Sequence, residues 1–471
     1  MDKRSLGILL GAAAMLATSG LTWADTSSAG NASVPASAQT PAPAQTPAPA
    51  QPQTPMPVPA VSTENAPPLM KGLDQIKTGD SSVGQNMQSA GIEIGGYGEL
   101  GYTKDLGNSN PIPGRTFTSE AKNGLTLNAI DLYIAKTINL RGTQIHQQGV
   151  ILGGKVDVLY GYNGDFIHSN GLNSYHDYNA NMQTSPLYQF DLQQLYVDAG
   201  FALGNNSAML LRFGKFDSPM GYERINPAKN AFYSHSFAFG NLTPYTQTGL
   251  LAKVVVGQDV SFWAGVTRGW NQTFRDNNTG VDGLLGIGFK PNSQLNGKVN
   301  VSFGPQDNGT NNPNRLVIEP IITYVPPILN NALSLTSDTV IYYDGAGNTA
   351  NGQSGGAFDE ALYQTYRYNR FISYNFREEY AYFGSGVSEG LGNQGRTVGV
   401  PVNFQQFGGI PNALNLGELT VGISLTPFPD SAMLRTLVIR PELREDLADH
   451  GVLSGGKHYQ TTVGVDAVYS F

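Results

Sequence analysis

From Ile92 to the last residue, apolar side chains recur at every second position in one strand-length segment after another. Such alternation places apolar groups on one face of a β-strand and polar groups on the other. We therefore predict about sixteen strands. The expected strands are 92–103, 125–137, 150–162, 187–201, 208–217, 245–256, 259–270, 281–290, 295–304, 315–325, 332–343, 360–368, 371–383, 418–426, 432–447 and 460–471.

The connections between these segments alternate in length. Those after odd-numbered segments are mostly long, as at 104–124, 163–186 and 218–244, whereas those after even-numbered segments are mostly short, as at Gly257-Gln258 and Asn369-Arg370. Long loops at one end and tight turns at the other are typical of barrels in outer membranes. We predict an all-β fold: a transmembrane antiparallel β-barrel over residues 92–471, with long outer loops and short periplasmic turns.

The composition excludes other classes of protein. Only 14% of the residues are charged, against ~25% in typical soluble domains. The longest apolar stretch, Leu6–Leu16, is about half the ~20 residues that a transmembrane helix needs. The net charge is −8 without any basic run, so we expect no nucleic-acid partner. The absence of Cys excludes disulfides and thiolate metal sites.

The residues before the barrel are predicted to form a signal peptide followed by a spacer. Lys3 and Arg4 precede a short apolar run, and Thr22-Trp23-Ala24 offers a cleavage site, which predicts a signal peptide over 1–24. Residues 25–91 are rich in Ala, Pro, Thr and Gln, a composition that cannot bury a core. We expect a disordered periplasmic spacer there, and we expect the mature protein in the outer membrane.

The alternation also assigns charged residues to the inside of the barrel. Early strands supply mostly acids, namely Glu93, Glu99, Asp131, Asp157 and Asp191, together with Lys155. Late strands supply the expected pore-wall residues Arg367, Arg377, Glu379, Arg440, Glu442 and Arg444. Charges on one face of such strands indicate a water-filled interior. The arginines either form a basic wall opposite the acids or pair locally with Glu379, Glu442 and Glu445, and the sequence leaves both readings open.

The connection 218–244 differs from an ordinary surface loop. It is rich in aromatic residues, including Phe232, Tyr233, Phe237 and Phe239, and it is poor in charge. A long connection of this kind tends to be functional. We predict that it folds into the pore and narrows it, with an external cap over the barrel mouth as the alternative. The expected constriction residues are Asp217, Glu223, Arg224, Lys229, Tyr233 and His235.

The last strand carries a specific pattern at its end. Apolar residues alternate with polar ones up to Tyr469 and the terminal Phe471. A terminal Phe with an aromatic residue two positions earlier resembles the assembly signal of outer-membrane barrels. We therefore expect Tyr469 and Phe471 to be read by the barrel-assembly machinery.

Several motifs resemble one protein family. Residues 214–223 read GKFDSPMGYE, 232–236 read FYSHS, 244–249 read PYTQTG, and 376–380 read FREEY. Together they resemble the β-barrel porin family labelled OmpL-like, over the barrel from about residue 92 onward. Gln247 stands where the family pattern has His. The resemblance implies an outer-membrane channel, but it implies neither a particular substrate nor particular functional residues.

The function expected from these observations is that of a porin, which lets small hydrophilic solutes or ions diffuse through a water-filled channel. The alternative is an adhesin or ligand-binding barrel with a plugged lumen. We expect no enzyme, cofactor or metal site, because no Ser–His pair follows from the positions of the six His residues. Expected partners are outer-membrane lipid and small solutes, and monomer and homotrimer both stay open.

Overall fold

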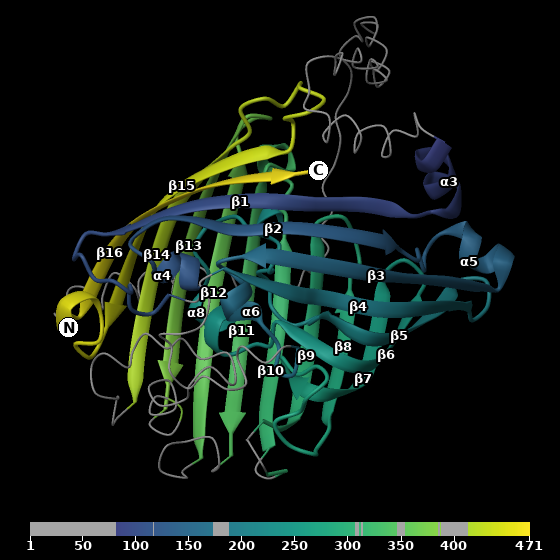
Figure 1. Ribbon diagram of the computed structural model, residues 1–471, viewed down its shortest axis with the longest axis horizontal. Coiled ribbons are helices and arrows are strands. Elements are labelled where there is room, and N and C mark those ends of the chain that lie inside the picture. Colours follow the sequence, from purple (N-terminus) through teal and green to yellow (C-terminus); the bar gives the residue numbers. More distant parts are fainter. Residues whose placement is uncertain are drawn as a thin grey trace, which may run out of the picture. The chain divides into compact units, whose positions relative to one another are not determined.

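The computed structural model describes residues 82–115, 117–172, 188–306, 310–311, 314–345, 354–384, 387 and 413–471. This part of the chain forms a closed barrel in which sixteen strands pair antiparallel with their neighbours in sequence (Figure 1). The strands are β1 (Glu93–Asp105), β2 (Gly124–Lys136), β3 (Val150–Gly161), β4 (Gln189–Ala202), β5 (Ser207–Asp217), β6 (Thr246–Val256), β7 (Val260–Trp270), β8 (Asp282–Phe289), β9 (Leu295–Pro305), β10 (Asn314–Tyr324), β11 (Leu333–Asp344), β12 (Gly355–Arg367), β13 (Ile372–Phe383), β14 (Leu414–Leu425), β15 (Leu437–Ala448) and β16 (Tyr459–Ser470).

The predicted strands agree with the observed ones. Each of the sixteen expected segments overlaps one strand, and the fold class is confirmed. The largest differences are at strand starts: β12 begins at Gly355 rather than 360, and β15 begins at Leu437 rather than 432. Gly355 and Gly356 lack the apolar side chains that mark a strand, yet they pair with Asp344 and Tyr343 of β11. Backbone pairing with β11 therefore extends β12 beyond its expected start. The alternation of apolar and polar residues does not reveal such pairing.

The first and last strands close the barrel. In the register of β1 and β16, Tyr97 lies opposite Ser470 and Leu100 lies opposite Ala467. The terminal Phe471 continues this pairing, because its N–H donates to the Gly96 carbonyl at 3.0 Å and its carbonyl accepts from the Gly96 N–H at 3.2 Å. The last residue of the chain is therefore part of the seam.

The distribution of side chains is the reverse of that in a soluble protein. Outward positions carry large apolar groups, such as Phe213 and Leu152, which are 66% and 68% exposed. Inward positions carry polar groups that are fully buried, such as Asn300, Asp359 and Thr420. An apolar outer band around a polar interior is the arrangement that a barrel needs in a bilayer.

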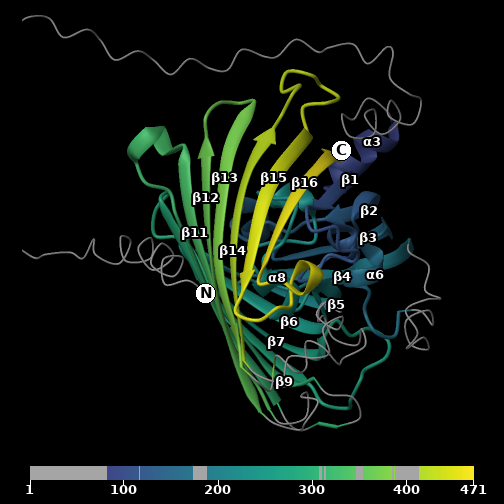
Figure 2. The ribbon, with the colours of Figure 1, turned by 90° about the vertical axis from the view of Figure 1, so that its left-hand side faces the viewer.

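The described part of the chain also contains short helices. They are α3 (Ser82–Ala90), α4 (Thr118–Ala121), α5 (Thr143–Gln148), α6 (Gly164–Ile167) and α8 (Phe237–Asn241), with 3-10 turns η1 (Pro227–Lys229), η2 (Ile328–Asn331) and η4 (Ser454–Gly456). None of the described helices is long and apolar enough to span a membrane. Both views draw α8 within the ring of strands (Figures 1 and 2).

Helix α3 corrects one prediction. The expected disordered spacer extended to residue 91, but residues 82–90 are helical. Gly91 ends the helix with φ +69°, and the N–H groups of Gly91 and Ile92 donate to the carbonyl groups of Gln88 and Met87. This is the pattern of a glycine C-cap, which leads the chain directly into β1. The signal peptide 1–24 and residues 25–81 of the spacer lie outside the described residues.

Candidate functional site

The connection between β5 and β6, residues 218–245, runs inside the barrel and is the core of the candidate site. We call it the inner segment. Its ends lie side by side, because the Ser218 N–H donates to the Tyr245 carbonyl at 2.9 Å. Local capping shapes it: the Asn226 side chain accepts from the Ala228 N–H in η1, and the Ser236 hydroxyl accepts from the Phe239 N–H in α8. Most of its aromatic side chains are buried, as expected for a segment packed against a wall.

Carboxylates of the barrel wall bind the backbone of the inner segment. The acceptors are on β10, β11, β13 and β15. Glu319 accepts from the N–H of Gly221 (2.7 Å), Asp338 from Tyr222 (3.0 Å), Glu442 from Tyr233 (2.9 Å) and Ser234 (3.1 Å), and Glu379 from Phe237 (2.9 Å) and Ala238 (3.0 Å). Backbone N–H groups away from water require partners, and hydrogen bonds to charged acceptors are stronger than neutral ones. The wall acids therefore fix the path of the segment.

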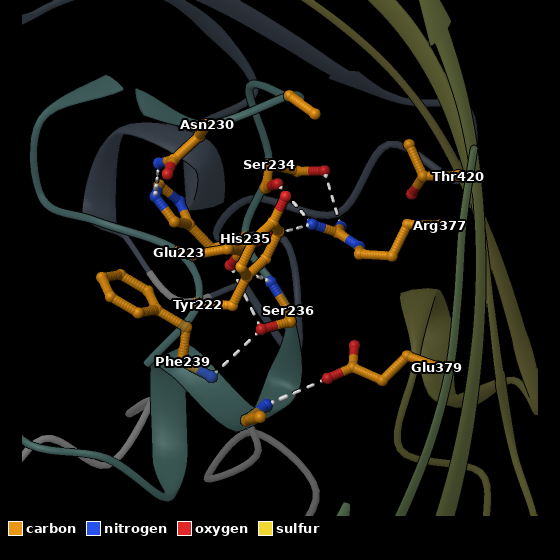
Figure 3. A network of polar contacts seen from close by, with 12 residues as sticks. Tyr222, Glu223, Asn230, Ser234, His235, Ser236, Phe239, Arg377, Glu379 and Thr420 are labelled. Atoms are coloured by element: carbon orange, nitrogen blue, oxygen red, sulfur yellow. Dashed lines mark hydrogen bonds and ion pairs between the residues drawn. The ribbon is translucent and has the colours of Figure 1, made fainter. Parts of the chain in front are cut away.

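Arg377 of β13 is the centre of these contacts. Its guanidinium donates to Glu223 of the segment at 2.7 Å and to the Ser234 carbonyl at 2.8 Å (Figure 3). It also donates to Glu418 of β14 at 3.0 Å. Its side chain is completely buried. Burial alone would raise the pKa of Glu223, but Arg377, helped by His235 and by hydrogen bonds from Ser236, holds that pKa below its ordinary value. Glu223 is therefore held as a carboxylate.

Two arginines of β15 bind the segment through its carbonyl groups. Arg440 donates to the carbonyls of Pro227 and Asn230, both at 2.7 Å, and Arg444 donates to the carbonyl of His235 at 2.5 Å. Both side chains are almost completely buried, at 3% and 1% exposed. The inner segment is thus bound by its N–H groups to acids and by its carbonyls to arginines.

The wall arginines do not form a basic wall opposite the acids, which was one of the two hypotheses from the sequence. Each one is paired with an acid on its own or an adjacent strand: Arg377 with Glu418, Arg440 with Asp466, and Arg444 with Asp446. The arginines do pair locally, as the other hypothesis predicts. Their partners, however, are not the expected Glu379, Glu442 and Glu445. Glu379 and Glu442 bind the inner segment instead, and Glu445 accepts from Thr461.

His235 of the inner segment contacts the loop that connects β1 and β2. Nδ1 of His235 lies 2.5 Å from a carboxylate oxygen of Glu120 in α4, and the rings of His235 and Phe117 have centroids 4.4 Å apart. Arg115 of the same loop forms a 2.8 Å ion pair with Asp446 of β15. Strand periodicity could not reveal Glu120 or Arg115, because both lie in a loop.

On its other side the inner segment borders a cavity of about 340 Å³ along β1–β5. The lining residues are Tyr97, Asp131, Tyr133, Lys155, Asp157, Gln193, Gln194, Asp217, Tyr222, Arg224, Asn226 and Lys229. The strands contribute three carboxylates and the inner segment contributes two cations. Within the described residues, the inner segment is therefore bound to the wall along β9–β16 and borders a cavity along β1–β5. We call these the filled side and the open side.

An irregularity in β4 positions two of the cavity carboxylates. The adjacent residues Gln193 and Gln194 are both nearly buried, at 2% and 5% exposed, although neighbours on a regular strand point to opposite faces. Gln193 donates to Asp217 at 3.0 Å and Gln194 donates to Asp157 at 2.9 Å. Simple alternation missed both glutamines, since a local break in the pleat is not visible as a period of two.

The structure divides the expected constriction residues between the two sides of the inner segment. Asp217, Arg224 and Lys229 line the cavity. Glu223, Tyr233 and His235 are buried between the segment and its surroundings. Of the expected pore-wall residues, Arg367 alone is exposed, at the end of β12.

Two further predictions concern the end of the chain and metal binding. The rings of Tyr469 and Phe471 have centroids 6.3 Å apart, and the backbone of Phe471 extends the seam.

Within the described ranges, no group of three or more His, Cys, Asp or Glu residues is arranged to hold a metal ion.

These features define an outer-membrane β-barrel with an inner segment that divides its lumen. Residues 91–471 match the family model described as "Putative beta-barrel porin-2, OmpL-like", and the chain belongs to that family. The resemblance predicted from the motifs is thereby confirmed, and the chain is an outer-membrane porin. A comparison with curated proteins finds no match.

Solved structures show a similar fold. The high-pH structure of Pseudomonas putida OprB has a TM-score of 0.52 at 11% identity and covers 84% of this chain and 97% of its own. An anion-selective porin from Comamonas acidovorans has a TM-score of 0.47 at 10% identity, covering 81% and 99%. The outer membrane channel DcaP of Acinetobacter baumannii has 0.46 at 11% identity, covering 81% and 97%. The likeness to OprB concerns the fold alone.

Proposed function

We propose that the porin passes small hydrophilic solutes by diffusion and that the inner segment forms its constriction. One observation carries this proposal: the segment is bound along β9–β16, yet it leaves a polar cavity along β1–β5. Barrels of about sixteen strands leave an aqueous lumen, whereas eight strands enclose little more than their own side chains. Passage of this kind needs neither a nucleophile nor a metal.

The proposal extends to the ends of the chain. Residues 1–24 direct export and are removed, residues 25–81 form a periplasmic spacer, and the terminal strand is recognised during assembly. Support for the last point is the position of Phe471 in the β1–β16 seam. The mass of the detergent-solubilised protein, measured by light scattering, separates monomer from homotrimer.

Planar-bilayer recording tests the constriction. Because Ser218 and Tyr245 are hydrogen-bonded neighbours, a two-residue Gly-Ser linker can replace residues 219–244 without moving β5 or β6. We expect discrete conductance steps for the complete chain and larger steps for the shortened one. Equal conductance in two correctly folded barrels would contradict the role of the segment.

The alternative of a ligand-binding barrel with a plugged lumen also has one observation in its favour. The inner segment buries Phe232 and Phe237 almost completely, at 1% exposed each, as a plug would. The same recording separates the two functions. A folded complete chain that shows no steps, together with a shortened chain that does, would establish the plug and refute diffusion.

A further inference from the structure

We propose that the cavity selects zwitterionic solutes, which are small molecules that carry an ammonium group at one end and a carboxylate at the other. This inference rests on the proposed function, since it assumes that solutes cross the barrel beside the inner segment. It names the chemical class that the passage favours. Two charged surfaces face the cavity, one on the strands and one on the inner segment.

The strand side of the cavity has unused acceptors for an ammonium group. Asp131 and Asp157 are both 2% exposed, and their carboxyl groups are hydrogen-bonded to each other. No other described donor reaches Oδ2 of Asp131 or Oδ1 of Asp157. The other oxygen of Asp157 is already bound by Lys155 at 2.5 Å and by Gln194 at 2.9 Å. Two carboxyl groups in contact repel each other unless a proton or a cation lies between them, and an ammonium group brings three donors.

The inner segment presents cations to the same cavity. Arg224 is fixed by its own backbone, whose N–H and carbonyl are both hydrogen-bonded to the Asn230 side chain at 2.8 Å. Lys229 is exposed in η1 and makes no ion pair with any described residue. A guanidinium and an ammonium group at these positions can receive a carboxylate.

The acidic and basic groups around the cavity are separated in space. Three acids, Asp131, Asp157 and Asp217, face the cavity from the strands, and Lys155 neutralises one of them by direct contact. The acidic groups of Asp131 and Asp217 are on the strand side, and the positive charges of Arg224 and Lys229 are on the segment. A simple cation or anion is attracted by one side and repelled by the other.

A zwitterion interacts favourably with both sides at once when it is oriented across the cavity. The volume of about 340 Å³ is at the lower end of the usual ~300–1,000 Å³ for ligand sites. It therefore suits a molecule of amino-acid size. Charge and volume together point to small amino acids, or solutes with the same pair of groups, as the favoured class.

Swelling of proteoliposomes in glycine and in its uncharged isomer glycolamide tests this preference. The isomers have equal composition, so the ratio of their swelling rates reports charge rather than size. The first variant is Asp131→Asn with Asp157→Asn, and the second is Arg224→Gln with Lys229→Gln. Matched controls are Asp259→Asn and Lys290→Gln, which are exposed charges just outside β7 and β8.

We expect a glycine-to-glycolamide ratio above one for the unchanged chain. The ratio should fall about threefold in both double variants, because each removes one of the two attractive surfaces. It should stay constant in the two controls. Lys229→Gln alone should show a smaller fall, and because this side chain is exposed, its removal leaves folding intact.

Two results would overturn the inference. A ratio of one in the unchanged chain would show that zwitterions are not favoured. A ratio that falls in one double variant and rises in the other would show selection by the sign of charge. A folded barrel that admits neither isomer would instead refute the proposed diffusion function, so that the two failures are distinguishable.

Discussion

The two sides of the barrel interior both carry buried charges but use them differently. On the β9–β16 side, acids and arginines are buried against the inner segment, as Arg377 is between Glu223 and Glu418. On the β1–β5 side, the carboxyl groups of Asp131 and Asp157 contact each other and face a cavity. The same strand alternation points both sets of side chains inward. The inward direction alone therefore does not decide whether a charged side chain stabilises the inner segment or lines the cavity.

The difference lies in what covers each wall. A buried ion pair requires a partner for every charge, and removing one partner leaves the other uncompensated. The β9–β16 wall meets this requirement with the backbone groups of the inner segment. The β1–β5 wall instead borders the cavity of about 340 Å³.

The largest expected effect is at the seam where the two sides meet. Deletion of Phe471 removes both backbone hydrogen bonds to Gly96 and the proposed assembly signal. We expect most of the heat-modifiable barrel to be lost from the outer membrane, with degradation in the periplasm. An unchanged amount of folded barrel, measured by gel mobility before and after heating, would contradict this expectation.

The next effect concerns the filled side. Arg377→Ala should destabilise the docked inner segment by about 3–5 kcal/mol, because it leaves the Glu223 and Glu418 carboxylates buried without their partner. We expect larger and noisier conductance steps and faster proteolysis of the segment.

The matched control is Arg370→Ala. This arginine pairs with Asp430 at the surface, where the two side chains are 61% and 65% exposed, so its loss should change stability by no more than about 1 kcal/mol. If the two variants gave the same recordings, the buried arginine would not hold the segment.

A smaller effect is expected from acid. The pKa of Glu223 is held below its ordinary value, so its contribution to docking is complete above pH ~4.3 and is lost as the pH falls through the lowered pKa. Conductance should therefore be steady from pH 5 to 8 and become noisy below about pH 4. Recordings of the Glu223→Gln variant should be noisy at every pH. A transition to noisy conductance near pH 6 in the unchanged chain would show that a group other than Glu223 controls docking.

The smallest effect is expected from the proposed spacer. Removal of residues 31–81 keeps the leader, α3 and the contacts described above for the two walls, so single-channel conductance should not change. A change in single-channel conductance beyond ordinary gating noise would show that the spacer reaches the lumen. The two sides of the lumen would then not alone determine the conductance.

The sequence predicted the strands well because a period of two is a local property. It also placed Arg377, Arg440 and Arg444 on the inner face, as observed. Their partners could not be predicted, since Glu223 is 154 residues away from Arg377 and belongs to a loop whose path has no period. The inward positions of Gln193 and Gln194 were missed for a related reason, because a break in the pleat of β4 depends on its neighbours.

The central claim is that the inner segment is packed against the β9–β16 wall, whereas its opposite side borders a cavity that small molecules can enter. Because the chain contains no Cys, single cysteines can be labelled with a charged thiol reagent while current is recorded. Lys229→Cys faces the cavity, and Thr420→Cys replaces a completely buried side chain on β14. We predict rapid labelling and a reduced current for the first, and no reaction for the second in the folded barrel. Rapid labelling of the Cys at position 420, with no effect at position 229, would contradict the account.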